Sequence, residues 1–213
     1  AASRDAFNRS ILGGSATLGK VDDFFQPTEG TLYRPGFEVA AGLLGSGVEY
    51  AKAELNVAHY RPLSRNVQAG ARLYGGYIKP FGASSDQFDP IVEYRFDLNR
   101  FYAGGSSDVR GWGLQQLGPK LIIADTVALP AGPSGAGPAQ PTEVQNFLYE
   151  AVGGTAKVAT NLEVRTPFPG LSESWRAAFF VDAGYLNAEE GGRGLYNAKQ
   201  LRVGTGAGIR YLT

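Results

Sequence analysis

The sequence contains no cysteine and no methionine, and His59 is its only histidine. Without cysteine there can be no disulfide, no thiolate ligand for zinc and no thiol nucleophile. A single histidine cannot form a histidine cluster for a metal, and the sequence shows no usual Ser–His pair around it. We therefore expect no catalytic site, no metal and no other cofactor, and the chain is not predicted to be an enzyme. The missing start methionine and the absence of a visible signal peptide predict a processed form or a piece of a larger protein.

The chain also lacks net charge and long apolar runs. Its 20 basic residues balance its 20 acidic ones, so no charge excess points to nucleic acid as a partner. No apolar run approaches the roughly 20 residues that a membrane-spanning helix needs. Glycine, in contrast, is abundant with 30 residues, and aromatic residues make up 12%. This composition is typical of strands and turns, and it leaves both a soluble β domain and a transmembrane β-barrel open.

Small or apolar residues alternate with polar ones in several segments. The alternation runs through residues 37–43, 48–61, 67–75, 156–165, 175–185 and 201–211, with a weaker candidate at about 9–21. Successive side chains of a strand point to opposite faces, so this period indicates β-strands. Turn sequences such as "QPTEG" and "RPLSRN" separate them. The sequence therefore predicts an all-β fold, an antiparallel up-and-down meander of about seven strands.

The two faces of these strands differ in a way that favours a membrane barrel over a soluble sandwich. The polar face carries charged residues at mid-strand, and the strands are long for a sandwich, where about 5 to 6 residues is usual. We expect the following residues to face lipid or the apolar side: Ala51, Leu55, Val158, Leu162, Val181 and Val203. We expect the following residues to face inward: Glu54, Arg72, Glu163, Asp182 and Arg202. The connections on one side are short, whereas the other side holds a connection at about 79–150, as in outer-membrane barrels.

Three motifs occur in order along the chain: "RFYAGGSSDVRGWGLQQLGP", "VGGTAKVATNLEVRTPFP" and "AAFFVDAGYL". Together they resemble the barrel of the BamA/TamA superfamily of outer-membrane assembly factors (bacterial surface antigen barrel). The resemblance extends from about Asp22 to Thr213, and the "VRGW" and "FVDAG" pair is its most specific part. It implies that residues 1–213 are a partial outer-membrane β-barrel domain, with about seven of sixteen strands in the C-terminal half of the barrel. It also implies a long outer loop at about 79–150.

The same resemblance carries expectations about function. It implies a barrel portion of a factor in the bacterial outer membrane that helps fold and insert β-barrel proteins. Its partners would be membrane lipids, unfolded outer-membrane protein substrates, accessory assembly subunits, and the missing strands and periplasmic POTRA domains of a full-length chain. No POTRA domain is recognised in this chain. A two-partner-type secretion pore of the same superfamily and a soluble β-sandwich binding domain stand as alternatives.

The resemblance further implies a loop lock. In the family, the long outer loop folds into the barrel, and the arginine of its VRG motif meets an acidic pair on the wall. The matching residues here are Val109, Arg110, Gly111 and Trp112 in the loop, with Glu163 and Asp182 on the wall. Phe180 lies two residues from Asp182 on the same predicted face, and we expect it to stack on Arg110. Both acids lie on the polar faces derived from the alternation alone. Without the resemblance, Arg110 reads as an ordinary exposed loop arginine.

Other candidates receive plainer interpretations. The remaining inward charges are expected to line the barrel interior: Lys52, Glu54, Arg72, Lys157, Arg165, Arg202 and Arg210. The "GTGAG" run at 204–208 resembles a nucleotide-binding loop, but it lies within an alternating strand and no helix follows, so we reject phosphate binding. The insertion "LPAGPSGAGPAQP" at 129–141 is expected to be mobile and exposed.

Overall fold

The computed structural model describes residues 8–84, 100–128, 143–172, 174–187, 195–196 and 201–211. Its elements are eleven strands and two short 3₁₀ turns. They are β1 (Ile11–Ser15), β2 (Leu18–Val21), β3 (Gly30–Ala40), η1 (Gly42–Leu44), β4 (Tyr50–Pro62), β5 (Gln68–Pro80), η2 (Gly82–Ser84), β6 (Lys120–Ala128), β7 (Glu143–Ala151), β8 (Ala156–Pro167), β9 (Trp175–Asn187), β10 (Leu195–Tyr196) and β11 (Arg202–Tyr211). None of the helical turns in these described ranges is long and apolar enough to cross a membrane.

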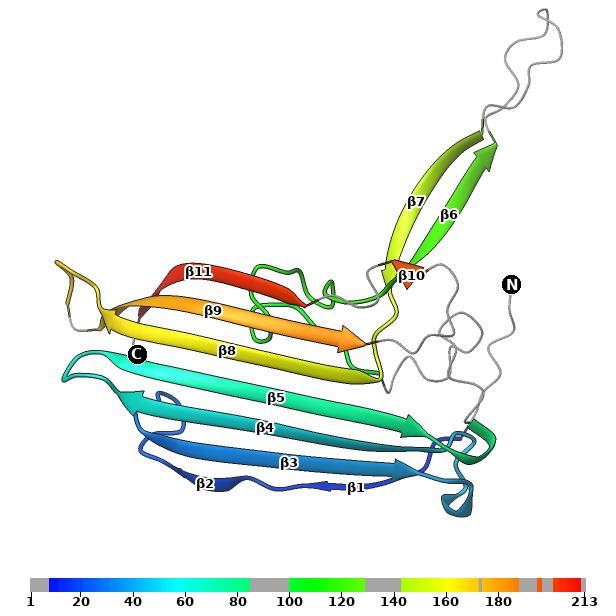
Figure 1. The fold of residues 1–213 in the computed structure, drawn as a ribbon, viewed down its shortest axis with the longest axis horizontal. Coiled ribbons are helices and arrows are strands. Elements are labelled where there is room, and N and C mark those ends of the chain that lie inside the picture. The colour runs from blue at the N-terminus through cyan, green and yellow to red at the C-terminus, as the bar shows by residue number, and fades with distance from the viewer. Residues whose placement is uncertain are drawn as a thin grey trace, which may run out of the picture.

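Eight of the strands form one antiparallel sheet, called the main sheet here. Its order is β1-β3-β4-β5-β8-β9-β11, and β2 pairs with β3 beside β1 (Figure 1). β1 and β2 are thus two halves of one interrupted edge strand, which the sequence predicts as a single weak candidate. β1 and β11 lie at opposite ends of this order, so the described part of the sheet is open. The all-β antiparallel meander is confirmed, as one open part of a barrel.

The register of the main sheet places the apolar and charged residues on opposite faces, as the alternation predicts. Leu162 pairs with Val181, and their side chains are 52% and 47% exposed. The next residues along the two strands, Glu163 and Asp182, are buried. We call the face with Glu163 and Asp182 the inner face and the other the outer face. No second layer covers the outer face among the described residues, so its apolar side chains need a non-aqueous neighbour.

One expectation about a strand boundary is wrong, and the long connection contains strands that the sequence analysis did not predict. The strand predicted at 37–43 is β3, which begins at Gly30 and ends at Ala40, and residues 42–44 instead form a 3₁₀ turn that Gly45 closes with a φ of 77°. The connection predicted at about 79–150 contains strands that the alternation did not indicate. β6 and β7 pair as a hairpin, and β10 joins β6, so that they form a second, three-stranded sheet (Figure 1). The Pro/Gly/Ala-rich insertion at 129–141 lies outside the described residues.

The buried apolar core lies on the inner face of the main sheet, where residues 100–119 fold back onto it. We call residues 100–119 the docked loop. It contributes Phe101, Ala103, Val109 and Leu117 to the core. The strands and the β3–β4 connection contribute the remaining members, which are Ala40, Val48, Tyr50, Ile78, Ala159 and Leu186. The loop therefore replaces the second layer that a lone sheet would need on this face.

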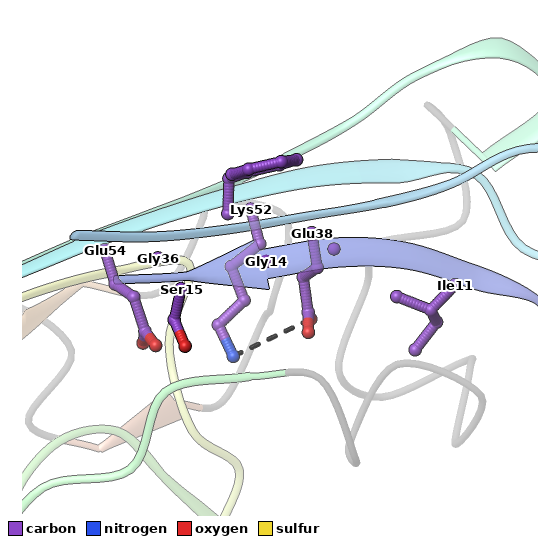
Figure 2. A pocket seen from close by; sticks show the side chains of 9 residues that line it. Ile11, Gly14, Ser15, Gly36, Glu38, Lys52 and Glu54 are labelled. Carbon is purple, nitrogen blue, oxygen red and sulfur yellow. Dashed lines mark ion pairs between the residues drawn. The ribbon is translucent and has the colours of Figure 1, made fainter. Parts of the chain in front are cut away.

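A hollow of about 410 Å³ lies on the inner face near the first strands. It is bordered by β1, β3 and β4 and contains Glu38, Lys52 and Glu54, whose side chains point to the same side (Figure 2). Lys52 Nζ lies 3.8 Å from Glu38 Oε1 and also lies over the Phe101 ring of the docked loop. The hollow is thus a charged part of the inner face beside the loop.

The turn between β2 and β3 is fixed by two carboxylates. Asp22 Oδ1 accepts hydrogen bonds from the backbone N–H groups of Thr28 and Glu29, and its Oδ2 accepts one from the Thr28 hydroxyl at 2.5 Å. Asp23 Oδ1 accepts bonds from the next turn residues, Phe25 and Gln26. The hydrogen bonds to the ionised form lower the pKa of Asp22. The turn presents Phe24 and Phe25 to the exterior, and Phe25 is 96% exposed.

We expect Asp22→Asn to loosen this turn. An amide at this position accepts hydrogen bonds less strongly than a carboxylate, so chymotrypsin at pH 7 should cut at Phe24 or Phe25 faster in the variant than in the wild type. The folded-state pKa lies below the unfolded one, so this stabilisation is complete above the unfolded pKa of about 3.9 and is lost as the pH falls further toward the folded value. With pepsin in acid, the difference should therefore shrink. Glu29→Gln removes a charge from the same turn and serves as the control; equal cleavage of both variants at pH 7 would contradict the prediction.

Candidate functional site

The docked loop is a narrow hairpin that lies across the inner face. Its base is tied to the segment before β8, because Phe101 and Gly154 form a two-way backbone bridge. Its arms are joined by Ala103 and Leu117 and, nearer the tip, by a bond from Gly105 N–H to Trp112 O at 3.0 Å. Gly104, Gly105 and Gly111 adopt positive φ values of 102°, 110° and 91°. These values favour glycine and let the chain reverse in a few residues.

Arg110 at the tip binds both wall acids. Its Nε and Nη2 donate to Asp182 Oδ2 and Oδ1 at 2.6 and 2.8 Å, and its backbone N–H donates to Asp182 Oδ2 at 2.9 Å. Its Nη1 donates to Glu163 Oε2. The Phe180 ring lies beneath the guanidinium, with its centroid 3.7 Å from Arg110 Cζ. Asp182 is fully buried and Arg110 is 19% exposed. The structure thus brings Arg110, Asp182, Glu163 and Phe180 together.

The strand register explains why one arginine reaches both acids. Asn161 pairs with Asp182 and Glu163 pairs with Phe180, so the two acids occupy neighbouring inward rows and are diagonal to each other. Diagonal neighbours in an antiparallel pair are about 7–8 Å apart at their backbones. A guanidinium has donors on both sides of its planar fork and spans this gap. A lysine has a single point of charge and cannot serve both carboxylates in the same way.

Glu163 is also bound by two arginines that the sequence analysis treats as plain wall charge. Arg165 Nε donates to Glu163 Oε1 at 2.7 Å. Arg210 Nη2 lies 2.8 Å from the same carboxylate and reaches it from β11, across β9. Glu163 therefore joins the loop, its own strand and the last strand of the main sheet. No feature of the sequence pattern ranks these two arginines above the other inward charges.

Val109 packs on a glycine of the wall, and Trp112 packs against the core on the other side of Arg110 and Gly111. Val109 is fully buried, and a Cβ at Gly184 would lie 2.5 Å from its Cγ2. A Cβ at Gly204 would lie 2.0 Å from the Arg110 carbonyl oxygen. Trp112 contacts the core, and the Arg202 guanidinium lies 5.2 Å from its ring centroid. Gly111 lies between Arg110 and Trp112 in the chain, and a Cβ added to it would lie 3.8 Å from Gly204 Cα of the wall.

The glycine-rich run at 204–208 thus has a role that the sequence analysis missed. Gly204 and Gly206 face inward, and a Cβ at Gly206 would meet the Phe180 ring at 2.6 Å. Because these glycines have no side chains, the loop tip and the Phe180 ring can approach the backbone of β11 closely. The signal was present in the sequence, since every second residue at 204, 206 and 208 is glycine on the face predicted to point inward.

The arrangement can hold a loop, but its described residues offer no reactive group. No group of three His, Cys, Asp or Glu residues in the described ranges could bind a metal. The acids of the site are engaged by arginines rather than poised beside a nucleophile. Its chemistry is therefore that of a set of charge-assisted hydrogen bonds between a loop and a wall.

Comparison with known proteins places these features in a family. The model of the Omp85 superfamily domain matches residues 1–213. The sorting and assembly machinery component 50 homolog of Mus musculus is 26% identical over 212 residues, covering 94% of this chain and 38% of that protein; its Homo sapiens counterpart gives the same figures. The sorting assembly machinery 50 kDa subunit of Saccharomyces cerevisiae is 26% identical over 183 residues, covering 84% of this chain and 30% of that protein. The chain therefore spans about a third of the length of these relatives.

We expect Gly204→Ala to displace the loop tip and Gly208→Ala to leave it in place. The two glycines lie on the same face of β11, but only the first has a backbone carbonyl within 4 Å of an added Cβ. Overpacking of this kind costs about 1–3 kcal/mol, whereas an alanine in open space removes the conformational cost of glycine, about 0.5–1 kcal/mol. Urea titrations of the full-length protein should show a lower midpoint for Gly204→Ala and an equal or higher one for Gly208→Ala. Equal midpoints for the two variants would contradict the close approach.

Proposed function

The chain belongs to the Omp85 superfamily, and on this basis we propose that it is part of the membrane-embedded barrel of a factor that helps fold and insert β-barrel proteins. The observation that carries the proposal is the docked loop, whose Arg110 binds Asp182 and Glu163 on the barrel wall. The names of the relatives, components of sorting and assembly machineries, support a role in protein assembly rather than in enzymatic catalysis.

The proposal assigns each part of the structure a place. Residues 1–213 form a partial barrel domain, and the connection between β5 and β8 is the long outer loop. The outer face contacts lipid, because its leucines and valines are exposed in the described chain while the charged residues lie inside. Strands from the rest of the full-length protein pair with the open edges, β1 and β11, since an unpaired edge cannot exist in hydrocarbon. Unfolded β-barrel proteins are the substrates, and accessory assembly subunits are further partners.

The membrane in question is an outer membrane. The sequence resemblance predicts the bacterial outer membrane, whereas the relatives come from animals and yeast. The bacterial assignment therefore stays a prediction.

A secretion pore of the same superfamily would share the loop and the acids, so the proposal is tested by activity: an assembly factor inserts a reporter β-barrel protein into vesicles, whereas a pore passes an unfolded chain across them. The exposed apolar side chains of the outer face, such as Leu162 and Val181, support the membrane barrel over the soluble sandwich, and the β6–β7 hairpin extends away from the main sheet (Figure 1).

We propose that the Arg110 contacts act as a lock that the assembly activity requires. Removing one partner of a buried ion pair leaves an uncompensated charge and costs on the order of 3 kcal/mol. Arg110→Ala and Asp182→Ala in the full-length protein should each slow insertion of the reporter and expose the loop to protease. The double variant should be little worse than either single one, because both changes remove the same contact. Arg110→Lys should restore little, since an ammonium lacks the planar fork.

Arg61→Ala is the matched control, because Arg61 is an exposed arginine at the end of β4. Its insertion rate and protease pattern should equal those of the wild type. Additive losses in the Arg110/Asp182 cycle, or loop exposure without loss of insertion, would refute the lock. Wild-type protein that conducts an unfolded chain but inserts no reporter would refute the assembly function and favour the secretion pore.

A further inference from the structure

Lys157 contacts both an arm and the tip of the docked loop. It lies on the inner face of β8 and is 9% exposed. Its Nζ donates to Tyr102 O at 2.8 Å and to Asp108 Oδ2 at 2.9 Å, and it lies 5.1 Å from the centroid of the Tyr74 ring on β5. An ammonium has three donors. Two of them bind the loop, one at an arm and one at the tip, and an aromatic face lies close to the charge.

Asp108 depends on Lys157 for its charge balance. Its side chain is 13% exposed, and Lys157 is the cation that forms an ion pair with it among the described residues. Asp108 Oδ2 also accepts a bond from Gly104 N–H at 2.8 Å, which closes the tip of the loop on itself. A carboxylate buried to this extent without a cation would be strongly destabilising. The loop conformation and the Lys157 ammonium therefore require each other.

The backbone around Asp108 is held by two further wall side chains. Arg72 Nη1 on β5 donates to Ser107 O at 2.7 Å. Asn161 Nδ2 on β8 donates to Asp108 O. These contacts and the Lys157 pair lie two to three residues before Arg110. Neither Asp108 nor Lys157 forms an ion pair with Arg110, Glu163 or Asp182 in the described structure.

We propose that Lys157 and Asp108 form a second anchor that positions the docked loop and is separable in energy from the Arg110 lock. The two anchors bind the same tip to different wall residues, so each contributes its own share to the docked state. The inference deepens the proposed function, because the position of this loop is what the lock is proposed to control. It rests on the geometry of the loop and needs no assembly activity for its test.

The anchor predicts a particular pattern of coupling. Lys157→Met and Asp108→Asn remove the same ion pair, so their effects should not add. Lys157→Met and Arg110→Lys weaken different contacts of one docked loop, so their effects should multiply. Asp108→Asn keeps an oxygen that can accept the Gly104 N–H, which confines the change to the charge. Lys157→Arg keeps the charge and tests whether the cation or the packing of the lysine is what matters.

The experiment measures maleimide labelling of a cysteine placed at Val109 in the full-length protein, in detergent and in a background with no other reactive thiol. This chain has no cysteine of its own, and Val109 is fully buried in the docked loop. The labelling rate therefore reports the undocked population. All variants carry Val109→Cys, and Lys79→Met, which removes an exposed lysine of β5, is the control.

We expect Lys157→Met and Asp108→Asn each to raise the labelling rate about tenfold or more, because each leaves a buried charge without its partner. The double variant should stay within about threefold of the faster single one, whereas Lys157→Met with Arg110→Lys should approach the product of the two single effects. Lys157→Arg should remain closer to the wild type than to Lys157→Met. If Lys157→Met does not fold, Asp108→Asn, which alters only the loop, carries the test.

Labelling of both single variants at the rate of Lys79→Met would overturn the anchor, and so would a multiplicative Lys157/Asp108 cycle. If the Lys157→Met/Arg110→Lys double variant is labelled no faster than the faster of its two single variants, the two contacts form one shared lock, and the proposal is overturned. Failure of the assembly function is distinguishable, because it would abolish reporter insertion by the wild type and leave the labelling pattern unchanged.

Discussion

The burial of one positive charge, that of the Arg110 guanidinium, constrains the rest of this structure. The guanidinium lies between a loop and a sheet and is held by Asp182, which is fully buried, and by Glu163. Charges removed from water need partners in good geometry. These partners come from two strands in a diagonal arrangement that holds in one register only. A slip of one residue would turn Glu163 or Asp182 to the outer face, so the loop contact and the strand register support each other.

The docked loop approaches the wall so closely that several wall positions must be glycine. Gly184 and Gly204 face the loop tip, Gly76 faces the Phe101 ring at the loop base, and Gly206 faces the ring under Arg110. Each glycine inside a strand weakens that strand by roughly 0.5–1 kcal/mol relative to alanine. The loop offsets this cost by burying Phe101, Val109 and Leu117. The main sheet in this region is therefore more stable with the docked loop in place than without it.

The sequence predicted the strands well because a half-buried strand leaves a period of two in the residue types. It placed β4, β5, β8, β9 and β11 and assigned Leu162 and Glu163 to the correct faces. It failed at 37–43, where the alternation continued past Ala40 although the chain had already turned. It also missed the β6–β7 hairpin, whose alternation is weak. The contact of Arg110 with the two acids was expected from the resemblance. Other contacts depend on distances between segments far apart in the sequence, which no local sequence pattern contains; these are the contacts of Lys157, Arg165, Arg210 and the wall glycines.

The last strand of the main sheet depends on the loop as much as the loop depends on the wall. β11 has glycine at three successive inward positions, so its inner face buries little of its own. Besides the approach of Gly206 to the Phe180 ring, three contacts hold that face: Gly204 against the Arg110 carbonyl, the ion pair from Arg210 to Glu163 across β9, and the Arg202 guanidinium over the Trp112 ring. All three involve the docked loop or the acid that binds it. A displacement of the loop therefore weakens the contacts on the inner face of β11, while the hydrogen bonds of β11 to β9 remain. The docking of the loop and the stability of β11 are thus coupled in one conformational equilibrium.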